Sequence, residues 1–190
     1  MTEVQDVLNT RRTIHRFTDE QVADNILQDA LVAASNAPCH KHTHPWKFYM
    51  LGDKTRQMLM PIVTKYSELK SKQRNSKDFQ ADLQRAISKI TQPPILIAVT
   101  SKKSPHDDFR EKEDYAASVC ALHNMVLSFW GNGIGAKWST GSITRDIQTY
   151  AALSIDMETE EIIGFIKAGY AEKIPQVNKK PISEITTYLD

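Results

Sequence analysis

Residues 114–130 restrict the fold of this chain most, because they are apolar on nearly every side of the helix that they predict. A surface helix has an apolar stripe opposite a polar face, whereas a helix that is apolar all round is buried. We therefore expect this helix at the centre of the molecule or at an interface between subunits. Glu113 and Asp114 are expected to open it, where acidic groups interact favourably with the helix dipole. The glycines of residues 131–135 are expected to end it.

Three further segments predict strands. Residues 95–100 form a continuous, largely β-branched run, which is typical of a strand buried on both faces. Residues 46–51 are rich in strand-forming side chains and are closed by Gly52-Asp53. Residues 162–170 form the last strong strand. Because strands and helices do not alternate strictly along the chain, the pattern favours an α+β fold.

Helices are predicted between and before these strands. A short helix has apolar side chains at helical spacing within residues 4–8. A second helix, capped at Thr18-Asp19-Glu20, has its apolar face over residues 22–34 and stops before Pro38. Residues 54–91 are helical in pattern and very polar. We expect two exposed helices or a flexible excursion there.

The size and charge of the chain exclude several classes of protein. The 190 residues suit one domain over 1–190, or an obligate dimer with a shared core. A net charge of +1 indicates no overall attraction to nucleic acid or membranes. No stretch has the ~18 apolar residues of a spanning helix, and the N-terminus lacks signal-peptide features. Cys39 and Cys120 lie in unlike contexts, so no disulfide is expected. We expect a soluble, cytoplasmic protein.

The segment Arg11–Phe17, here called the basic septet, carries four basic side chains and a hydroxyl in seven positions. Arginine forks bind phosphate oxygens with two hydrogen bonds, and a threonine hydroxyl can add another. One interpretation is a site for a phosphate monoester. The other is a solvated basic turn at the end of a helix, and the local sequence leaves both open.

A loop between Pro38 and Pro45 carries three histidines, at His40, His42 and His44. On an extended segment, residues two apart share a face, so three imidazoles could converge on zinc or copper. The flanking prolines instead indicate an irregular loop, and no carboxylate lies nearby to support metal ligands. Surface histidines are therefore the favoured interpretation, with His40 a candidate hydrogen-bonding residue beside a ligand.

Two other motifs have a structural and a functional interpretation. The spacing Gly131-x-Gly133-x-Gly135 suggests a dinucleotide turn, but it follows a helix, the reverse of the strand–turn–helix context that this turn requires. We interpret it as a helix end and a tight turn. Trp138 is either a ligand wall or a core side chain. Lys179 and Lys180 are either phosphate ligands or a solvated pair.

Taken in order, these segments resemble the nitroreductase family of flavin-dependent oxidoreductases, and particularly its short, minimal members. The resemblance runs along the whole chain and is weakest at 54–91. It is carried by Arg11-Arg12-Thr13-x-His15-x-Phe17, residues 33–38, the loop from Cys39-His40-Lys41 to Pro45-Trp46-Lys47-Phe48, residues 94–99, Asp114 with its apolar helix, Gly133-Ile134-Gly135 before Trp138, and residues 166–170. The resemblance implies a central mixed, mainly antiparallel sheet flanked by helices, in an intertwined homodimer with FMN at the subunit interface. The polar 54–91 excursion would be a candidate lid.

The resemblance also implies roles for the basic septet. Arg11 and Thr13, with Arg12 beside them, would meet the phosphate and ribityl chain of FMN. His15 would lie by the pyrimidine end of the flavin. Family members often have arginine or lysine there, and a neutral histidine would stabilise reduced flavin less.

Further residues are assigned to FMN by the same resemblance. Trp138-Ser139-Thr140-Gly141 would line the isoalloxazine ring. Asn36 and His40 would reach the flavin of the other subunit. Lys179 would meet the phosphate, although it replaces an arginine and therefore lacks the bidentate fork.

The activity that the resemblance implies is transfer of hydride from NAD(P)H to flavin N5, and then to a nitroaromatic, quinone or enone. One stacking site for both substrates predicts ping-pong kinetics, and no side chain is required as an obligatory acid because the chemistry belongs to the cofactor. Two alternatives remain open: a non-redox protein that binds or senses flavin, and a metal-binding module that uses His40, His42 and His44.

Overall fold

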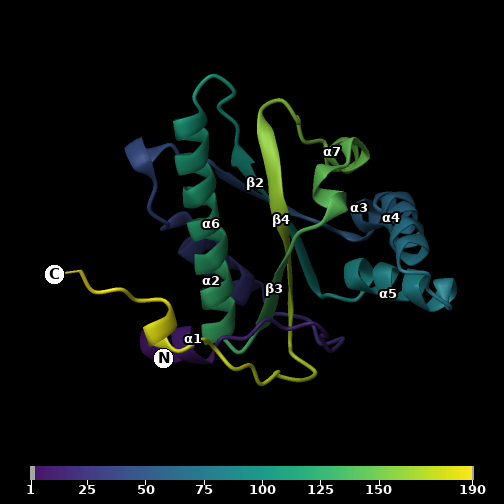
Figure 1. The fold of residues 1–190 in the computed structure, drawn as a ribbon, viewed down its shortest axis with the longest axis horizontal. Helices are drawn as coiled ribbons and strands as arrows, with labels where there is room; N and C mark the ends of the chain where they lie inside the picture. The colour runs from purple at the N-terminus through teal and green to yellow at the C-terminus, as the bar shows by residue number, and fades with distance from the viewer. Residues whose placement is uncertain (1–2, 190) are drawn as a thin grey trace.

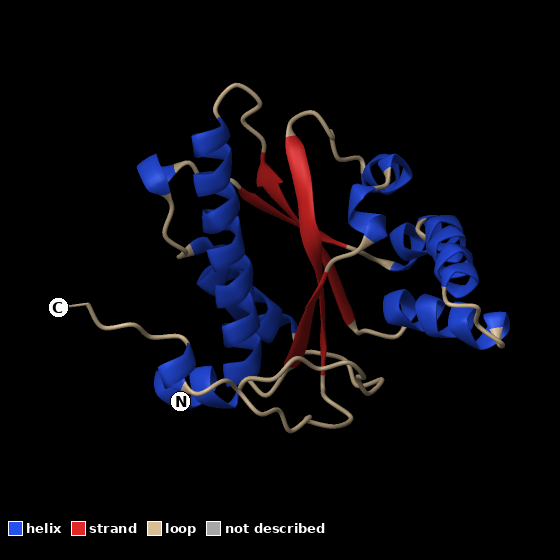
Figure 2. Cartoon of the chain, viewed as in Figure 1, coloured by secondary structure: helices blue, strands red, loops and turns tan. Residues whose placement is uncertain are grey.

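A four-stranded sheet lies between two groups of helices in the computed structural model, which describes residues 3–189 (Figures 1 and 2). The expected domain over 1–190 is therefore described except for its first two residues and its last. The strand order is β1-β2-β4-β3, and neighbouring strands are antiparallel. The strands are β1 (Trp46–Met50), β2 (Ile95–Lys102), β3 (Gly135–Ser139) and β4 (Glu160–Gly169).

Each face of the sheet has its own helices (Figure 2). One face is covered by α2 (Asp24–Ser35) and α6 (Asp108–Gly131), and α1 (Val4–Thr10) packs against α6. The other face is covered by α3 (Asp53–Met58), α4 (Met60–Gln73), α5 (Phe79–Thr91) and α7 (Ile147–Leu153). Short 3-10 turns form η1 (His40–His42), η2 (Ser142–Arg145) and η3 (Ile182–Glu184). The expected α+β class is confirmed, and the parallel element of the expected mixed sheet is an isolated bridge between Thr13 and Ala136.

The apolar helix predicted over 114–130 is the central helix α6, and it ends at Gly131 as expected. Its start was predicted wrongly at Glu113 and Asp114. The helix begins six residues before Asp114, because the side chain of Asp107 accepts a hydrogen bond from the Arg110 amide and caps the first turn. Asp114 instead lies inside the helix and is buried, where Thr43 and Arg110 donate hydrogen bonds to its carboxylate.

The start of α2 was also predicted wrongly. Thr18-Asp19-Glu20 does not cap this helix, which begins at Asp24 after an N-cap residue without a side-chain hydrogen bond. The Thr18 amide donates to the Tyr170 carbonyl at 2.9 Å, and Phe17 forms a bridge with Ala171. These contacts hold the chain in an extended conformation beside the end of β4, so the helix begins later.

The polar region 54–91 is helical, as predicted, and consists mainly of α3, α4 and α5. It is less exposed than the sequence suggested, because several of its apolar side chains point inward, although Met58, Leu69 and Phe79 remain exposed. Leu59, Ile62 and Ile90 are at most 5% exposed and join a core on the α3–α5 face of the sheet. The side chain of Asp78 caps α5 by accepting from the Ala81 amide.

Alternate residues of β4 supply two separate cores. Ile166 and Ala168 pack beneath α2 and α6, together with Met125 and Phe129 of α6. Phe165, on the opposite face, packs with the apolar side chains of α3–α5 and α7. Within residues 3–189, none of the helices combines the length and the apolar character needed to cross a membrane.

Candidate functional site

The basic septet lies beside strand β3, where one buried residue anchors it. The Ile14 amide donates to the Ala136 carbonyl at 3.1 Å, and the Ile14 side chain is completely buried. Ile14 packs so closely on Gly135 that a Cβ atom at that glycine would clash with it. Because side chains alternate along an extended segment, Thr13 and His15 point away from this contact and are exposed.

The arginines of the septet are available to a ligand. Arg12 Nη1 donates to the carbonyls of Asn9 and Arg11, both at 2.9 Å, which holds its guanidinium near the end of α1. No ion pair within residues 3–189 involves Arg11 or Arg12. Arg11 and Arg12 are half-buried and adjoin the exposed Thr13 in the chain, and guanidinium groups without carboxylate partners are suited to binding a phosphate.

His15 meets a lysine that the sequence analysis did not single out. Lys137 Nζ lies 3.1 Å from His15 Nδ1, so the ammonium donates and the imidazole accepts. Burial, followed by the positive charges of Lys137 and Lys89, lowers the pKa of His15. His15 is therefore kept neutral at this place, and the positive charge beside it belongs to Lys137.

Trp138-Ser139-Thr140-Gly141 continues from β3 into η2 at the other end of the same region. Trp138 is 39% exposed, and its Nε1 donates to the Ile163 carbonyl at 3.1 Å across the sheet. Gly164 lies against this indole, because a Cβ at Gly164 would overlap its nitrogen. Trp138 is thus a half-exposed wall rather than a core side chain. Ser139, Thr140 and Gly141 line an adjoining cavity.

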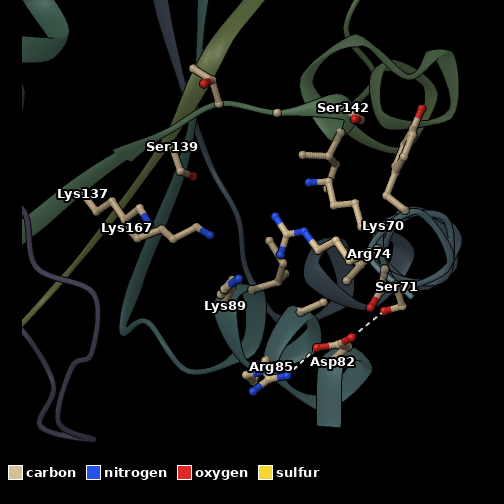
Figure 3. A pocket seen from close by; sticks show the side chains of 18 residues that line it. Lys70, Ser71, Arg74, Asp82, Arg85, Lys89, Lys137, Ser139, Ser142 and Lys167 are labelled. Carbon is tan, nitrogen blue, oxygen red and sulfur yellow. Dashed lines mark hydrogen bonds and ion pairs between the residues drawn. The ribbon is translucent and has the colours of Figure 1, made fainter. Parts of the chain in front are cut away.

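That cavity, here called the basic cavity, lies between strands β3 and β4 and the hairpin of α4 and α5, and has a volume of about 550 Å³ (Figure 3). Lys137 and Lys167 face each other directly across the β3–β4 pairing. Both line the cavity, with Lys89 of α5. Burial lowers the pKa of Lys167 to about 8, and the charges of Lys137 and Lys89 add to this effect. Burial, and then the charge of Lys89, also lowers the pKa of Lys137.

A second, smaller cavity joins the septet to the basic cavity. Its volume is about 420 Å³, and it is lined by His15 and by Lys89, Lys137 and Lys167. Since these three lysines line both cavities, the two cavities adjoin, with His15, Arg16 and Phe17 of the septet along one and Ser139, Thr140 and Gly141 along the other. The sequence carried a signal for these cavities, because Lys167 is a charged residue inside the otherwise apolar run 162–169.

Seven candidate residues line neither cavity: Arg11, Arg12, Thr13 and Trp138, and also Asn36, His40 and Lys179. Asn36 caps the end of α2, and its Nδ2 donates to the Val32 carbonyl at 2.8 Å. His40 lies in the turn η1 and is exposed, as is Lys179 in the C-terminal tail. Neither cavity brings Asn36, His40 or Lys179 together with the septet, of which only His15, Arg16 and Phe17 line a cavity.

The three histidines of the loop do not share a face of an extended segment. His40 and His42 belong to a 3-10 turn, and Lys41, His42 and His44 have φ values of 53°, 51° and 44°. In the described part of the chain, no group of three or more histidine, cysteine, aspartate or glutamate side chains could hold a metal ion. The extended geometry on which the metal-binding interpretation depended is not formed.

Comparisons with known proteins agree with this geometry. The model of a family described as "Nitroreductase family" matches residues 8–170. Among curated relatives, "Putative NAD(P)H nitroreductase YfhC" of Bacillus subtilis is 27% identical over 188 residues, covering 98% of this chain and 94% of that protein. An iodotyrosine deiodinase of Hydra vulgaris is 25% identical over 200 residues, covering 96% of this chain and 71% of that protein.

Solved structures show the same fold. A nitroreductase-like family protein from Bacillus cereus has a TM-score of 0.82 and 26% identity, covering 100% of this chain and 97% of that one. A "putative nitroreductase in complex with FMN" from Desulfovibrio desulfuricans has a TM-score of 0.78 and 21% identity, with coverage of 100% and 98%.

Proposed function

The chain belongs to the nitroreductase family, and from this premise we propose that it is an FMN-dependent oxidoreductase that uses NAD(P)H and acts as a homodimer. The observation that carries the proposal is a pair of adjoining basic cavities, one lined by His15, Arg16 and Phe17 of the septet and the other by Ser139, Thr140 and Gly141. FMN is an anion with a flat aromatic ring, and the similar protein from Desulfovibrio desulfuricans is described in complex with FMN.

The residues present fit this cofactor. Arg11 and Arg12 have no carboxylate partner in the described chain, and with the exposed Thr13 hydroxyl they would hold the phosphate. Trp138–Gly141 would line the isoalloxazine ring. Gly141 supports this assignment, because nothing lies within 4 Å of where its Cβ would be and its φ of 152° disfavours other residues.

When bound, FMN would accept hydride at N5 from NAD(P)H and pass it to a nitroaromatic, quinone or enone, with both substrates using one site in turn. The contribution of the chain is binding, orientation and positive charge. His15 is neutral and accepts from Lys137, so Lys137 supplies the lasting positive charge beside the septet. This charge would favour an anionic form of the reduced ring.

A second copy of the chain would complete the site. Asn36, His40 and Lys179 line neither cavity of their own chain, so we propose that Asn36 and His40 reach the cofactor of the partner. Apolar side chains that one chain leaves exposed support a dimer. They are Phe109 and Tyr115 on α6 and Ile174, Val177, Ile182, Ile185, Tyr188 and Leu189 in the tail. Light scattering of the purified protein tests the dimer, and a monomer at micromolar concentration would contradict it.

The absorbance spectrum of the purified protein, followed by anaerobic addition of NADH or NADPH, tests the function. We expect a flavin spectrum that bleaches with a reduced dinucleotide. Flavin that does not bleach would support the non-redox alternative, and elemental analysis of the same sample tests the metal-binding alternative. Initial rates at several concentrations of both substrates should give parallel lines, whereas intersecting lines would contradict a shared site.

Substitution of Arg11 tests the phosphate assignment. Arg11→Ala removes a charged hydrogen bond, which contributes about 1.5–3 kcal/mol, so FMN should bind about ten- to a hundredfold more weakly. Flavin fluorescence during dilution of the loaded protein measures this affinity. Arg145→Ala is the matched control, because Arg145 is an exposed arginine of η2 that does not belong to the septet. Equal flavin retention by both variants would show that Arg11 does not hold the phosphate.

A further inference from the structure

The basic cavity gathers six cationic side chains around one space. Lys70 comes from α4 and Arg74 from the residue that caps its C-terminus. Arg85 and Lys89 come from α5, Lys137 from β3 and Lys167 from β4. Figure 3 shows Arg74 and Lys167 extending into the cavity from opposite sides. Elements that are far apart in the sequence therefore direct positive charge at the same place.

The single carboxylate among the lining residues does not balance these charges. Asp82 accepts a hydrogen bond from Ser71 Oγ at 2.7 Å and forms an ion pair with Arg85 (Figure 3). Hydrogen bonds from Ser76, and then from Ser71 and Arg85, lower the pKa of Asp82 to about 2, so its charge is present but already engaged. Lys137 and Lys167, on the strand side of the cavity, take part in no ion pair within residues 3–189.

The position of Lys167 is expected to destabilise the folded protein. The residue is 7% exposed, and no hydrogen bond from its ammonium is formed to any part of the described chain. Its cross-strand neighbour is Lys137, and like charges directly opposite each other destabilise a sheet. A buried charge is costly without a partner. A solvated basic face on the outer surface does not explain Lys167, because its side chain is largely buried and its ammonium reaches only the space of the cavity.

The cavity is also separate from the proposed phosphate site of FMN. Arg11, Arg12 and Thr13 do not line it, whereas Ser139, Thr140 and Gly141 do. The cavity therefore opens beside the proposed lining of the isoalloxazine ring. Its volume of about 550 Å³ lies within the range of small-molecule sites.

We propose that the basic cavity binds the anionic group, a phosphate or a carboxylate, of a compound that exchanges electrons at the flavin. Arg74, Lys89 and Lys167 bind this group directly, and the hydroxyls of Ser139 and Ser142 lie at the same cavity wall. The position beside the flavin rests on the proposed function, while anion binding by the cavity does not. Two sources share this chemistry: the additional phosphate of NADPH, and an acidic electron acceptor.

Calorimetric titration of the purified flavoprotein with two matched pairs of compounds tests the proposal. NADP⁺ and NAD⁺ differ by one phosphate, and 4-nitrobenzoate and nitrobenzene differ by one carboxylate. We expect the anionic member of one pair to bind at least about tenfold more tightly, with an advantage that shrinks as salt rises. The pair that shows the advantage identifies the source.

Substitutions in the cavity test whether its residues cause the tighter binding of the anionic compound. Lys167→Met and Arg74→Gln remove one charge each from opposite walls, and each should abolish most of the advantage. Lys54→Gln is the matched control, because Lys54 is an exposed lysine of α3 that does not line the cavity. Equal binding within both pairs would overturn the proposal, as would an advantage that survives in both cavity variants.

The flavin spectrum of the same samples separates this proposal from the proposed function. A protein that prefers the anionic compound but holds no flavin supports the anion site and contradicts the oxidoreductase. A protein whose flavin is bleached by NAD(P)H, but which does not distinguish the members of either pair, supports the oxidoreductase and contradicts the anion site.

Discussion

The two faces of the sheet differ in what they bury, although both are built from the same strands. On the face beneath α2 and α6, the β4 residues Ile166 and Ala168 enter an apolar core. On the face beneath α3–α5, Phe165 enters a second core while Lys167, two residues later, enters the basic cavity. One strand thus supplies only apolar side chains to one face, and both a core side chain and a lysine that lines a cavity to the other.

This difference shows on which face of the sheet the fold tolerates a buried charged side chain. Apolar burial contributes roughly 25 cal/mol per Å², and the α6 face has a continuous apolar core that supplies it. The α4–α5 hairpin covers its end of the sheet without filling the space beside β3. A buried lysine there is tolerated because the core on the opposite face stabilises the shared strand.

The largest expected effect is on the apolar face. Phe129 of α6 is completely buried among the side chains of the first core, so Phe129→Ala should reduce the free energy of unfolding by about 3–5 kcal/mol. Denaturant unfolding at fixed protein concentration measures the change. Phe79→Ala is the control, because Phe79 is 48% exposed. Similar losses for the two variants would contradict the view that the α6 face carries the stability.

The next largest expected effect is an increase in the free energy of unfolding, and it comes from a substitution on the cavity face. Lys167→Met should stabilise the protein at pH 7, because burial and the charges of Lys137 and Lys89 lower the lysine pKa from 10.5 to about 8. This pKa shift means that the charged form of Lys167 reduces the stability of the folded protein by about 3 kcal/mol. Unfolding at several pH values compares the variant with the wild type.

The way stability changes with pH tests whether the charged form of Lys167 destabilises the folded protein. Between pH 8 and 10.5 the unfolded chain holds a proton on Lys167 that the folded chain has released, so wild-type stability rises with pH there. The advantage of Lys167→Met should therefore be full below pH 8 and shrink toward pH 10.5. A variant that is less stable than the wild type, or a difference that is constant over this range, would show that Lys167 is not strained.

The smallest effect on stability is expected at Arg85. Its ion pair with Asp82 lies within α5, and its side chain is 68% exposed, so the pair adds little to the free energy of folding. Arg85→Gln should change unfolding by less than about 0.5 kcal/mol and still weaken binding of the preferred anionic probe. Thermal unfolding and calorimetry on the same sample measure both quantities. A large loss of stability without any change in binding would assign Arg85 to the fold instead.

Local patterns predicted much of the fold. The β-branched run 95–100 lies within β2, the apolar helix is α6, and the polar region 54–91 is helical. Errors occurred where a distant contact overrode a local signal. Thr18 caps no helix because its amide bonds to Tyr170, and Asp114 opens no helix because Thr43 and Arg110 hold its carboxylate in the interior.

The candidate site was predicted in part. The septet was singled out from its residue types and Trp138–Gly141 from the family resemblance. His15, Arg16 and Phe17 and Ser139, Thr140 and Gly141 line adjoining cavities, and the roles of these residues toward FMN stay predictions. Lys89, Lys137 and Lys167 were not recognised, because each is a single lysine in a segment with another evident role. Their convergence follows from strand register and from the packing of α5, which no local pattern encodes.

The sequence by itself determined which segments form helices and strands, because apolar periodicity and turn chemistry act over a few residues. It also determined the chemistry of the septet, through two arginines and a hydroxyl in three consecutive positions. Only the tertiary structure decided that Lys137 and Lys167 lie opposite each other and face Arg74. Long-range pairing sets that geometry, and it turns scattered surface charges into a cavity with an unpaired positive charge.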